Sequence, residues 1–354
     1  MSSLKLGLSL GYWGSGPPAD AAALLLEAER LGFDSAWTSE AYGSDALTPL
    51  AWWGSNTRTI RLGTAICQIS ARAPAATAMA ALTLDHLSGG RFVLGLGVSG
   101  PQVVEGWYGQ PFAKPLARTR EYVAIVRQVL RRDAPLTNEG PHYPLPFPQG
   151  TGLAKPLKSI VYPLRAALPI IMGAEGPKNV ALAAEIADGW FPFLFSPQHM
   201  GAFGASLEEG FARPGARRSA SDFEVIATTP VIIDNDVDRA AQALKPMLAL
   251  YIGGMGAREA NFHFDVFVRM GFDAEARRVQ QLYLDGQRRE AVNAVPTKLV
   301  EQIALIGPRD KIRDELAAWR DSIATTLVVA APTQERTVLL PSVDTLRTMA
   351  ELVL

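Results

Sequence analysis

The segment LPIIMGAEGPKNVALAAEIADGW, from Leu168 to Trp190, decides the fold of this chain. Its first five residues, Leu168–Met172, form an apolar run long enough for a buried strand. Gly173 and Gly176 then allow a tight turn and a close approach of a ligand, because neither residue carries a Cβ. The segment therefore predicts a strand, a glycine turn and a helix in direct succession.

The turn is also a candidate anion site. Pro177 suits the first turn of a helix, where the amide groups have no partners within the helix. The partial positive charge of such a helix start attracts phosphate, and Lys178 adds a full charge there. The residues alone leave two readings open: a phosphate-binding loop, or an ordinary turn of an α/β protein.

Strand and helix patterns alternate along the rest of the chain. Further strands are expected at Lys5–Leu10, Ser35–Thr38, Ile60–Ile66, Phe92–Leu96, Trp190–Leu194, Phe223–Ile233 and Thr326–Ala330. Helices are expected at Asp20–Leu31, Thr48–Ser55, Pro74–Leu87, Leu116–Arg131, Pro197–Phe211, Asp238–Tyr251, Lys311–Trp319 and Leu346–Leu354.

Two segments interrupt the alternation. Thr137–Val161 is rich in Pro and Gly and reads as a long loop or hairpin, of the kind that often lines an active site. His142 and Tyr143 in this loop are candidates for a lid. The second irregular segment is Gly253–Val295, with helical patches expected around Phe264–Met270 and Ala274–Tyr283.

Eight strands, each followed by a helix, predict an α/β fold of the (β/α)8 TIM-barrel type. We expect one domain over residues 1–354, with insertions after the fourth strand (137–161) and after the seventh (253–295). The active site should then lie at the C-terminal ends of the strands. A doubly wound sheet is the alternative. The sequence GLGVSG at Gly95–Gly100 has the letters of a dinucleotide fingerprint, but it follows the fourth strand and no acidic residue comes at the expected place.

Composition narrows the class of protein. A formal net charge of −1 gives no electrostatic case for nucleic acid. Cys67 is the only cysteine, and neither His199 nor His263 has metal-ligand spacing, so no metal site is expected. The chain has no signal peptide and no apolar run of bilayer length, which predicts a soluble, cytoplasmic protein without membrane contact.

Several longer segments resemble a known family. The chain is similar to the bacterial luciferase-like superfamily of barrel oxidoreductases, and most similar to the branch that uses the deazaflavin coenzyme F(420). The matching segments are LGFDSAWTSE, RLGTAICQISARAPAATAMAALTLDHLSGGRFVLGLGVSG, GPQVVEGWYG, PLARTREYVAIVRQVL, GAEGPKN and VPTKLVEQIALIGPRDKI.

The resemblance implies an oxidoreductase that transfers a hydride between coenzyme F(420) and a small organic substrate, such as an alcohol/ketone pair or an activated C=C or C=N bond. It also implies a homodimer. The alternatives are an FMN-dependent monooxygenase and a relative that binds flavin or deazaflavin without catalysis.

The resemblance also assigns candidate site residues. Deazaflavin members carry a non-prolyl cis peptide in the third strand, at the position of Ala65-Ile66 here; the alternative is a plain trans strand. We expect the remaining cofactor contacts from the aromatic Tyr12 with its neighbour Trp13, from Gly97 and Val98 after the fourth strand, and from the phosphate loop Gly173, Ala174, Glu175, Gly176 and Pro177, with Lys178 beside it.

Charged residues at the mouth complete the set. Glu40 matches an acidic position near the deazaflavin ring. Relatives that oxidise a sugar phosphate have a glutamate where this chain has Gly100, and Glu105 could supply that carboxylate instead; Glu40 and Glu105 are the catalytic candidates. Arg72 is expected to meet the anionic coenzyme tail or the substrate, with Lys155 and Lys158 as further cationic candidates.

Overall fold

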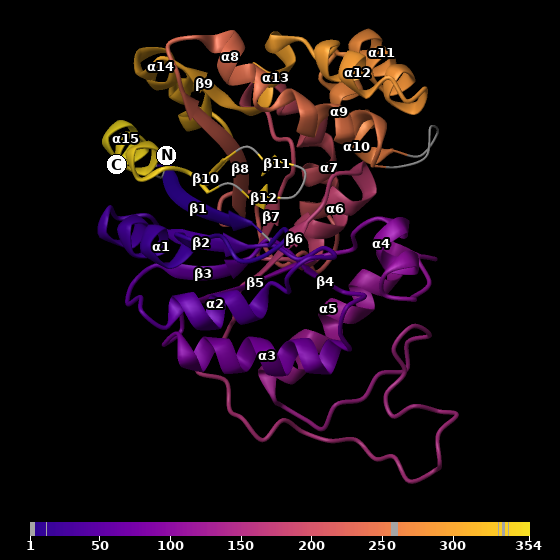
Figure 1. The fold of residues 1–354 in the computed structure, drawn as a ribbon. Helices are drawn as coiled ribbons and strands as arrows, with labels where there is room; N and C mark the ends of the chain where they lie inside the picture. The colour runs from indigo at the N-terminus through magenta and orange to yellow at the C-terminus, as the bar shows by residue number, and fades with distance from the viewer. Residues whose placement is uncertain (1–3, 12, 256–260, 332, 335–336, 339) are drawn as a thin grey trace.

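Eight parallel strands close into a barrel in the computed structural model (Figure 1), which describes the chain except residues 1–3, 12, 256–260, 332, 335–336 and 339. The ring runs β1-β2-β3-β5-β6-β7-β8-β10, and β10 pairs back with β1. This closure confirms the predicted (β/α)8 barrel. The strands are β1 Lys5–Gly11, β2 Ser35–Thr38, β3 Arg61–Thr64, β5 Phe92–Gly97, β6 Ile170–Gly173, β7 Gly189–Phe191, β8 Glu224–Ile233 and β10 Thr326–Ala330.

Helices surround the barrel (Figure 1) and present one apolar face to it. In α5 the buried side chains recur with helical spacing, as at Tyr122, Val126 and Val129. Four helices, α3 to α6, begin with proline, at the position where a missing N–H costs nothing. The outer helices are α1 Ala21–Arg30, α2 Leu47–Gly54, α3 Pro74–Leu87, α4 Pro101–Gly106, α5 Pro115–Arg131, α6 Pro177–Ile186, α7 Gly201–Phe211, α8 Val237–Gln242, α9 Lys245–Gly253, α14 Arg309–Arg320 and α15 Val343–Val353.

The barrel interior is filled by large side chains in the middle and by small ones towards the C-terminal ends. A separate cluster of buried side chains occupies the centre: Trp37, Val93, Ile171, Phe191, Ile226 and Val328. Because side chains alternate along a strand, the next inward positions on β5, β6 and β10 are Gly95, Gly97, Gly173 and Ala330. The C-terminal mouth of the barrel is therefore lined in part by backbone.

The third barrel strand, β3, is interrupted near the C-terminal mouth of the barrel, after Thr64. The Ala65-Ile66 peptide bond is cis, as the family resemblance implies. The chain resumes as β4 (Cys67–Gln68), which pairs with the end of β5. The Ile66 side chain lies against the glycines of β5 and β6: a Cβ on Gly97 would lie 2.7 Å from it, and one on Gly173 would lie 3.0 Å away.

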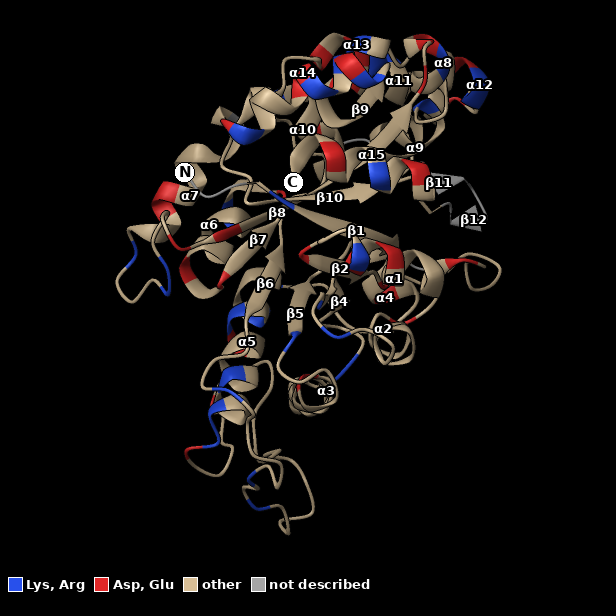
Figure 2. Cartoon of the chain, turned by 90° about the vertical axis from the view of Figure 1, so that its left-hand side faces the viewer, with Lys and Arg blue, Asp and Glu red and all other residues tan. Residues whose placement is uncertain are grey.

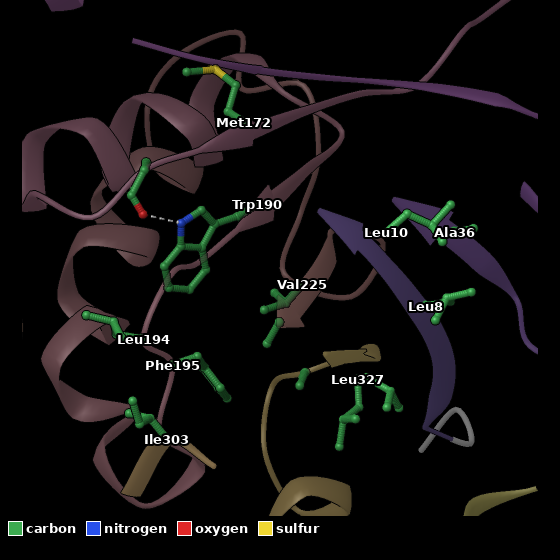
Figure 3. Packing of buried hydrophobic residues seen from close by; sticks show 14 of the residues in the cluster. Leu8, Leu10, Ala36, Met172, Trp190, Leu194, Phe195, Val225, Ile303 and Leu327 are labelled. Atoms are coloured by element: carbon green, nitrogen blue, oxygen red, sulfur yellow. Dashed lines mark hydrogen bonds between the residues drawn. The ribbon is translucent and has the colours of Figure 1, made fainter. Parts of the chain in front are cut away.

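The core between the barrel and its helices is continuous. Figure 3 shows part of it, where Trp190 lies near Leu194 and Phe195. Strand β7 is shorter than predicted: it ends at Phe191, and the chain then turns through Leu194, whose φ is 57°.

The segment between α5 and β6 forms a long loop that extends away from the barrel, past α3 and α5 (Figure 1). It contains one isolated bridge, Asn138 with Leu145, among its described residues. The carboxylate of Glu121 on α5 accepts hydrogen bonds from the amides of His142 and Tyr143. The Tyr143 ring packs edge-on against Tyr122. These contacts fix the hairpin to the outside of α5.

The segment after α9 is more helical than expected. It forms α10 Phe262–Arg269, α11 Asp273–Leu284, α12 Arg288–Asn293 and α13 Thr297–Ile303, followed by β9 Leu305–Gly307. The helical patches expected around Phe264–Met270 and Ala274–Tyr283 correspond to α10 and α11. Strand β9 pairs with the last residues of β8, beyond the barrel. The helix predicted at Asp238–Tyr251 is divided into α8 and α9, with Pro246 in the first turn of α9.

Charged side chains lie mostly on the outer helices and loops (Figure 2). Among the described residues, no helix combines the length and the apolar character needed to cross a bilayer.

Candidate active site at the barrel mouth

The turn between β6 and α6 has the conformation expected of an anion-binding loop. Gly176 precedes α6 with φ −70° and ψ 145°, and no atom lies within 4 Å of the place where its Cβ would be. Lys178, in the first turn of the helix, is exposed. Among the described residues, the amide N–H groups of Glu175 and Gly176 have no hydrogen-bond acceptor. The turn thus has two free amide donors, and there is open space at the Cβ position of Gly176.

Two side chains hold the carbonyl groups of the same turn. The indole Nε1 of Trp190 donates to the carbonyl oxygen of Ala174 at 2.8 Å, a bond drawn in Figure 3. Arg269, from α10, donates through Nη2 to the carbonyl oxygen of Glu175 at 3.2 Å. One contact comes from the barrel and the other from the segment after α9.

The side chain of Glu175 is also engaged by α10. Its Oε2 lies 2.9 Å from Nδ1 of His263, and both side chains are 10% exposed. The sequence left the role of this glutamate open. In the structure its carboxylate lies against α10, so it links the turn to that helix.

Glu40 follows β2 and is buried at the mouth, 7% exposed. Its carboxylate accepts a hydrogen bond from the amide of Gln68 at 2.9 Å and forms an ion pair with Arg72, whose Nη1 lies 2.8 Å from Oε1. The side-chain amide of Gln68 donates to the carbonyl of Glu40 at 3.0 Å. Arg72 was expected to face a ligand's anionic tail, but its guanidinium is already paired with this carboxylate.

Cys67 lies beside that pair and is not a reactive thiol. Burial, together with the nearby carboxylate of Glu40, raises the pKa of Cys67 to about 12. The thiol is therefore protonated at neutral pH and acts as a small apolar group.

The segment after β5 places Glu105 on the short helix α4, at an exposed position. Its Oε1 accepts a hydrogen bond from the amide of Phe112 at 3.2 Å. Tyr108, just after the helix, donates to the carbonyl of Ala41 at 3.1 Å. The α4 segment is thus joined to the loop after β2, next to Glu40. Gly97 ends β5 and Val98 follows it, half-buried.

Aromatic side chains stand at two sides of the mouth. Tyr12 lies outside the described residues. Its neighbour Trp13 packs against Trp53 with ring centroids 6.0 Å apart. On the other side Phe193, after β7, lies 4.8 Å from the Tyr251 ring and 5.6 Å from the His263 ring.

The structure thus gathers the turn at Gly173–Lys178, the bulge at Ala65-Ile66 and the Glu40–Arg72 pair at one end of the barrel. Sequence reasoning missed the partners that hold them: Gln68, Trp190, His263 and Arg269. One local signal was available for α10, since Asn261 caps its first turn by accepting from the amides of His263 and Phe264. Among the described residues, no group of three His, Cys, Asp or Glu side chains could hold a metal ion.

Comparison with known proteins agrees with this geometry. The sequence profile of the family described as luciferase-like monooxygenase matches residues 6–326. A Mycobacterium tuberculosis protein, named provisionally as a coenzyme F(420)-dependent oxidoreductase, is 57% identical over 95% of this chain and 97% of its own length. A 5,10-methylenetetrahydromethanopterin reductase of Archaeoglobus fulgidus is 28% identical over 86% of this chain and 87% of its own. The solved structure of the coenzyme F(420)-dependent tetrahydromethanopterin reductase of Methanopyrus kandleri has a TM-score of 0.80 at 25% identity and covers 99% of both chains.

Proposed function

The chain belongs to the luciferase-like monooxygenase family, and we propose that within this family it is a coenzyme F(420)-dependent oxidoreductase. The relative at 57% identity and the reductase structure at 25% identity both carry names that specify this coenzyme. The main structural support is at the barrel mouth. Gly97 and Gly173, which have no side chains, lie next to the β6–α6 turn, where two amide donors are free.

The residues present fit the coenzyme. A flat tricyclic ring needs a surface without protruding side chains. Gly97 and Gly173 project no side chain, and the room that they leave lets Ile66 lie close against the barrel wall. The phosphate needs several donors and no carboxylate in front of them. The amides of Glu175 and Gly176 supply donors, Lys178 supplies charge, and the Glu175 carboxylate lies against His263 on α10.

When bound, a deazaflavin supplies two-electron hydride transfer at carbon five of its ring. The protein's own part is to orient the reactants and keep water away from them. Trp13 and Phe193 are apolar walls suited to this task. We propose a small organic substrate, an alcohol/ketone pair or an activated C=C or C=N bond.

The two glutamates have different roles in this proposal. Both oxygens of Glu40 are engaged by Arg72 and one also by Gln68, so Glu40 positions the segment after the bulge. Glu105 is exposed and makes one hydrogen bond at its carboxylate, to the Phe112 amide. Of the two carboxylates it is the one that can move to meet a substrate, and we propose it as the group that exchanges a proton.

A second candidate is an FMN-dependent monooxygenase, which the family description itself favours. The two activities separate in one experiment. The purified protein is incubated without oxygen with oxidised coenzyme F(420) and a panel of alcohols, and separately with reduced FMN, oxygen and the same compounds. The proposal expects substrate-dependent loss of the deazaflavin absorbance. Product formed only with FMN and oxygen contradicts it. Tight binding of either cofactor without turnover of any compound indicates a non-catalytic binder.

We further propose that the 354 residues act as one domain in the cytoplasm and that the protein forms a homodimer, as the family resemblance implies. Light scattering of the purified protein tests the oligomeric state, and a mass of one chain contradicts the dimer.

A further inference from the structure

Arg269 and His263, both on α10, contact the turn that we propose as the phosphate site. Arg269 donates to the carbonyl of Glu175, and His263 lies against its carboxylate. Helix α10 is far from this turn in sequence and belongs to the segment after α9. We propose that α10 shapes the anion site, with Arg269 as a positioning residue for the coenzyme phosphate; this inference rests on the proposed function.

The geometry of the peptide group links the Arg269 and Trp190 contacts to the two free amides. A trans peptide is planar, so its C=O and its N–H point in opposite directions. The Arg269 contact fixes the carbonyl of Glu175, and the amide of Gly176 must then point the other way. The Trp190 contact does the same for the carbonyl of Ala174 and the amide of Glu175. Each of the two free amides is thus oriented by a side chain behind it.

The Arg269 side chain is half-buried and makes few polar contacts. Its Nε is buried and has no hydrogen-bond partner among the described residues, and the residue as a whole is half-buried. Its guanidinium lies 5.9 Å from the centre of the Phe203 ring. No ion pair with a carboxylate is found for Arg269 in the described part of the chain. A guanidinium held by one backbone carbonyl keeps most of its charge available to a nearby anion.

The Glu175 carboxylate is a negative charge close to the proposed phosphate site. A carboxylate at Glu175 would repel a phosphate if it faced the free amides. The carboxylate lies on the α10 side, with Oε2 2.9 Å from Nδ1 of His263. The His263 ring belongs to a cluster with Phe193, Tyr251 and Phe262. Helix α10 therefore does two things for the site: it orients the Gly176 amide and it keeps the Glu175 carboxylate away from the anion.

The test compares two ligands, the complete coenzyme and the deazaflavin riboside that lacks the phosphate and tail. Dissociation constants are measured by fluorescence quenching for the wild type, Arg269→Gln, Arg269→Lys and the control Arg277→Gln. Arg277 is an exposed arginine on α11 that pairs with Asp273, so its loss removes the same charge away from the turn.

Arg269→Gln should weaken binding of the coenzyme about tenfold, as expected for loss of a charged hydrogen-bond donor, and leave binding of the riboside within about twofold. Arg269→Lys should recover part of the loss, and Arg277→Gln should bind both ligands like the wild type. Equal weakening of both ligands means a merely structural role and overturns the inference. So does an unchanged affinity for the coenzyme.

The outcome also separates this inference from the proposed function. If the wild type binds neither ligand, the proposed function fails and the inference fails with it. If the wild type binds both, and Arg269→Gln does not discriminate between them, only the inference fails.

Discussion

The guanidinium of Arg72 lies against the carboxylate of Glu40, with Nη1 2.8 Å from Oε1 and 2.9 Å from Oε2. The two residues come from neighbouring loops at the barrel mouth and also engage Gln68 and, at 3.8 Å, Asp45. Each residue neutralises the charge of the other, which would otherwise be unpaired in a largely buried place. The pair therefore acts as one structural unit.

Removal of the Glu40 carboxylate should destabilise the fold. Glu40→Gln leaves the Arg72 charge with only the more distant carboxylate of Asp45. We expect the free energy of unfolding to fall by about 1–3 kcal/mol, less than for a fully buried pair because Arg72 is partly exposed. Urea unfolding measures it. A variant as stable as the wild type would show that the pair contributes nothing to the fold.

The mouth should not tolerate a side chain at Gly97. A Cβ there would lie 2.7 Å from Ile66, so Gly97→Val must displace Ile66 or fill the space above it. We expect at least tenfold weaker binding of both the coenzyme and the phosphate-free riboside, about 1.4 kcal/mol. Gly201→Val is the control, because no atom lies near its Cβ position. Equal affinities in the two variants would place the ring elsewhere.

A carboxylate in the phosphate turn should act on one ligand only. Gly176 has a backbone conformation open to any residue and free space at its Cβ, so Gly176→Asp should fold normally. We expect binding of the complete coenzyme to weaken by at least tenfold, roughly 1.4 kcal/mol, with the riboside little affected. Gly176→Asn supplies the same shape without the charge. An unchanged dissociation constant for Gly176→Asp would mean that the phosphate binds at another place.

Acid stability should depend on Asp188, which lies just before β7. Its buried carboxylate accepts from the Ile170 amide at 2.9 Å and pairs with Arg127, Arg217 and Arg218. Burial acts to raise the pKa of Asp188, but the Arg127 charge, the Ile170 amide and Arg217 outweigh it and lower the pKa.

The folded-state pKa of Asp188 thus lies below its unfolded value of about 3.9. Its contribution to stability is complete above that value and declines as the pH falls through the folded pKa. Asp188→Asn should lower the free energy of unfolding at pH 7 by about 2–3 kcal/mol, and the difference from the wild type should shrink in acid. A difference that stays constant down to pH 2 would exclude this origin.

The sequence was sufficient for elements whose pattern is local. Ser35–Thr38 and Pro74–Leu87 have the predicted bounds. The start of the helix is readable without tertiary contacts because it begins with a proline. Strand β9 was missed because three residues, Leu305–Gly307, carry no period. The helical spacing within Phe264–Met270 and Ala274–Tyr283 indicated α10 and α11, whereas α12, with six residues, is too short to show a period.

The site divides in the same way. The glycine turn and the position of the cis bond could be predicted, since they depend on a local motif and on family resemblance. The contacts Glu40–Arg72, Glu175–His263 and Arg269 to the Glu175 carbonyl join residues far apart in sequence. Contacts between residues that are far apart in sequence cannot be predicted from one sequence. The partner of each site residue was therefore found only in the structure.

The central claim is the choice of cofactor, and one titration tests it. Calorimetry measures the dissociation constants of coenzyme F(420) and FMN at low and high salt. The coenzyme carries an anionic tail beyond its phosphate, which Lys178 at the exposed edge of the turn can attract, and exposed charge contacts are screened by salt. We predict tighter binding of the deazaflavin at low salt and a smaller advantage at high salt. Tighter binding of FMN at every salt concentration would contradict the account and support the monooxygenase alternative.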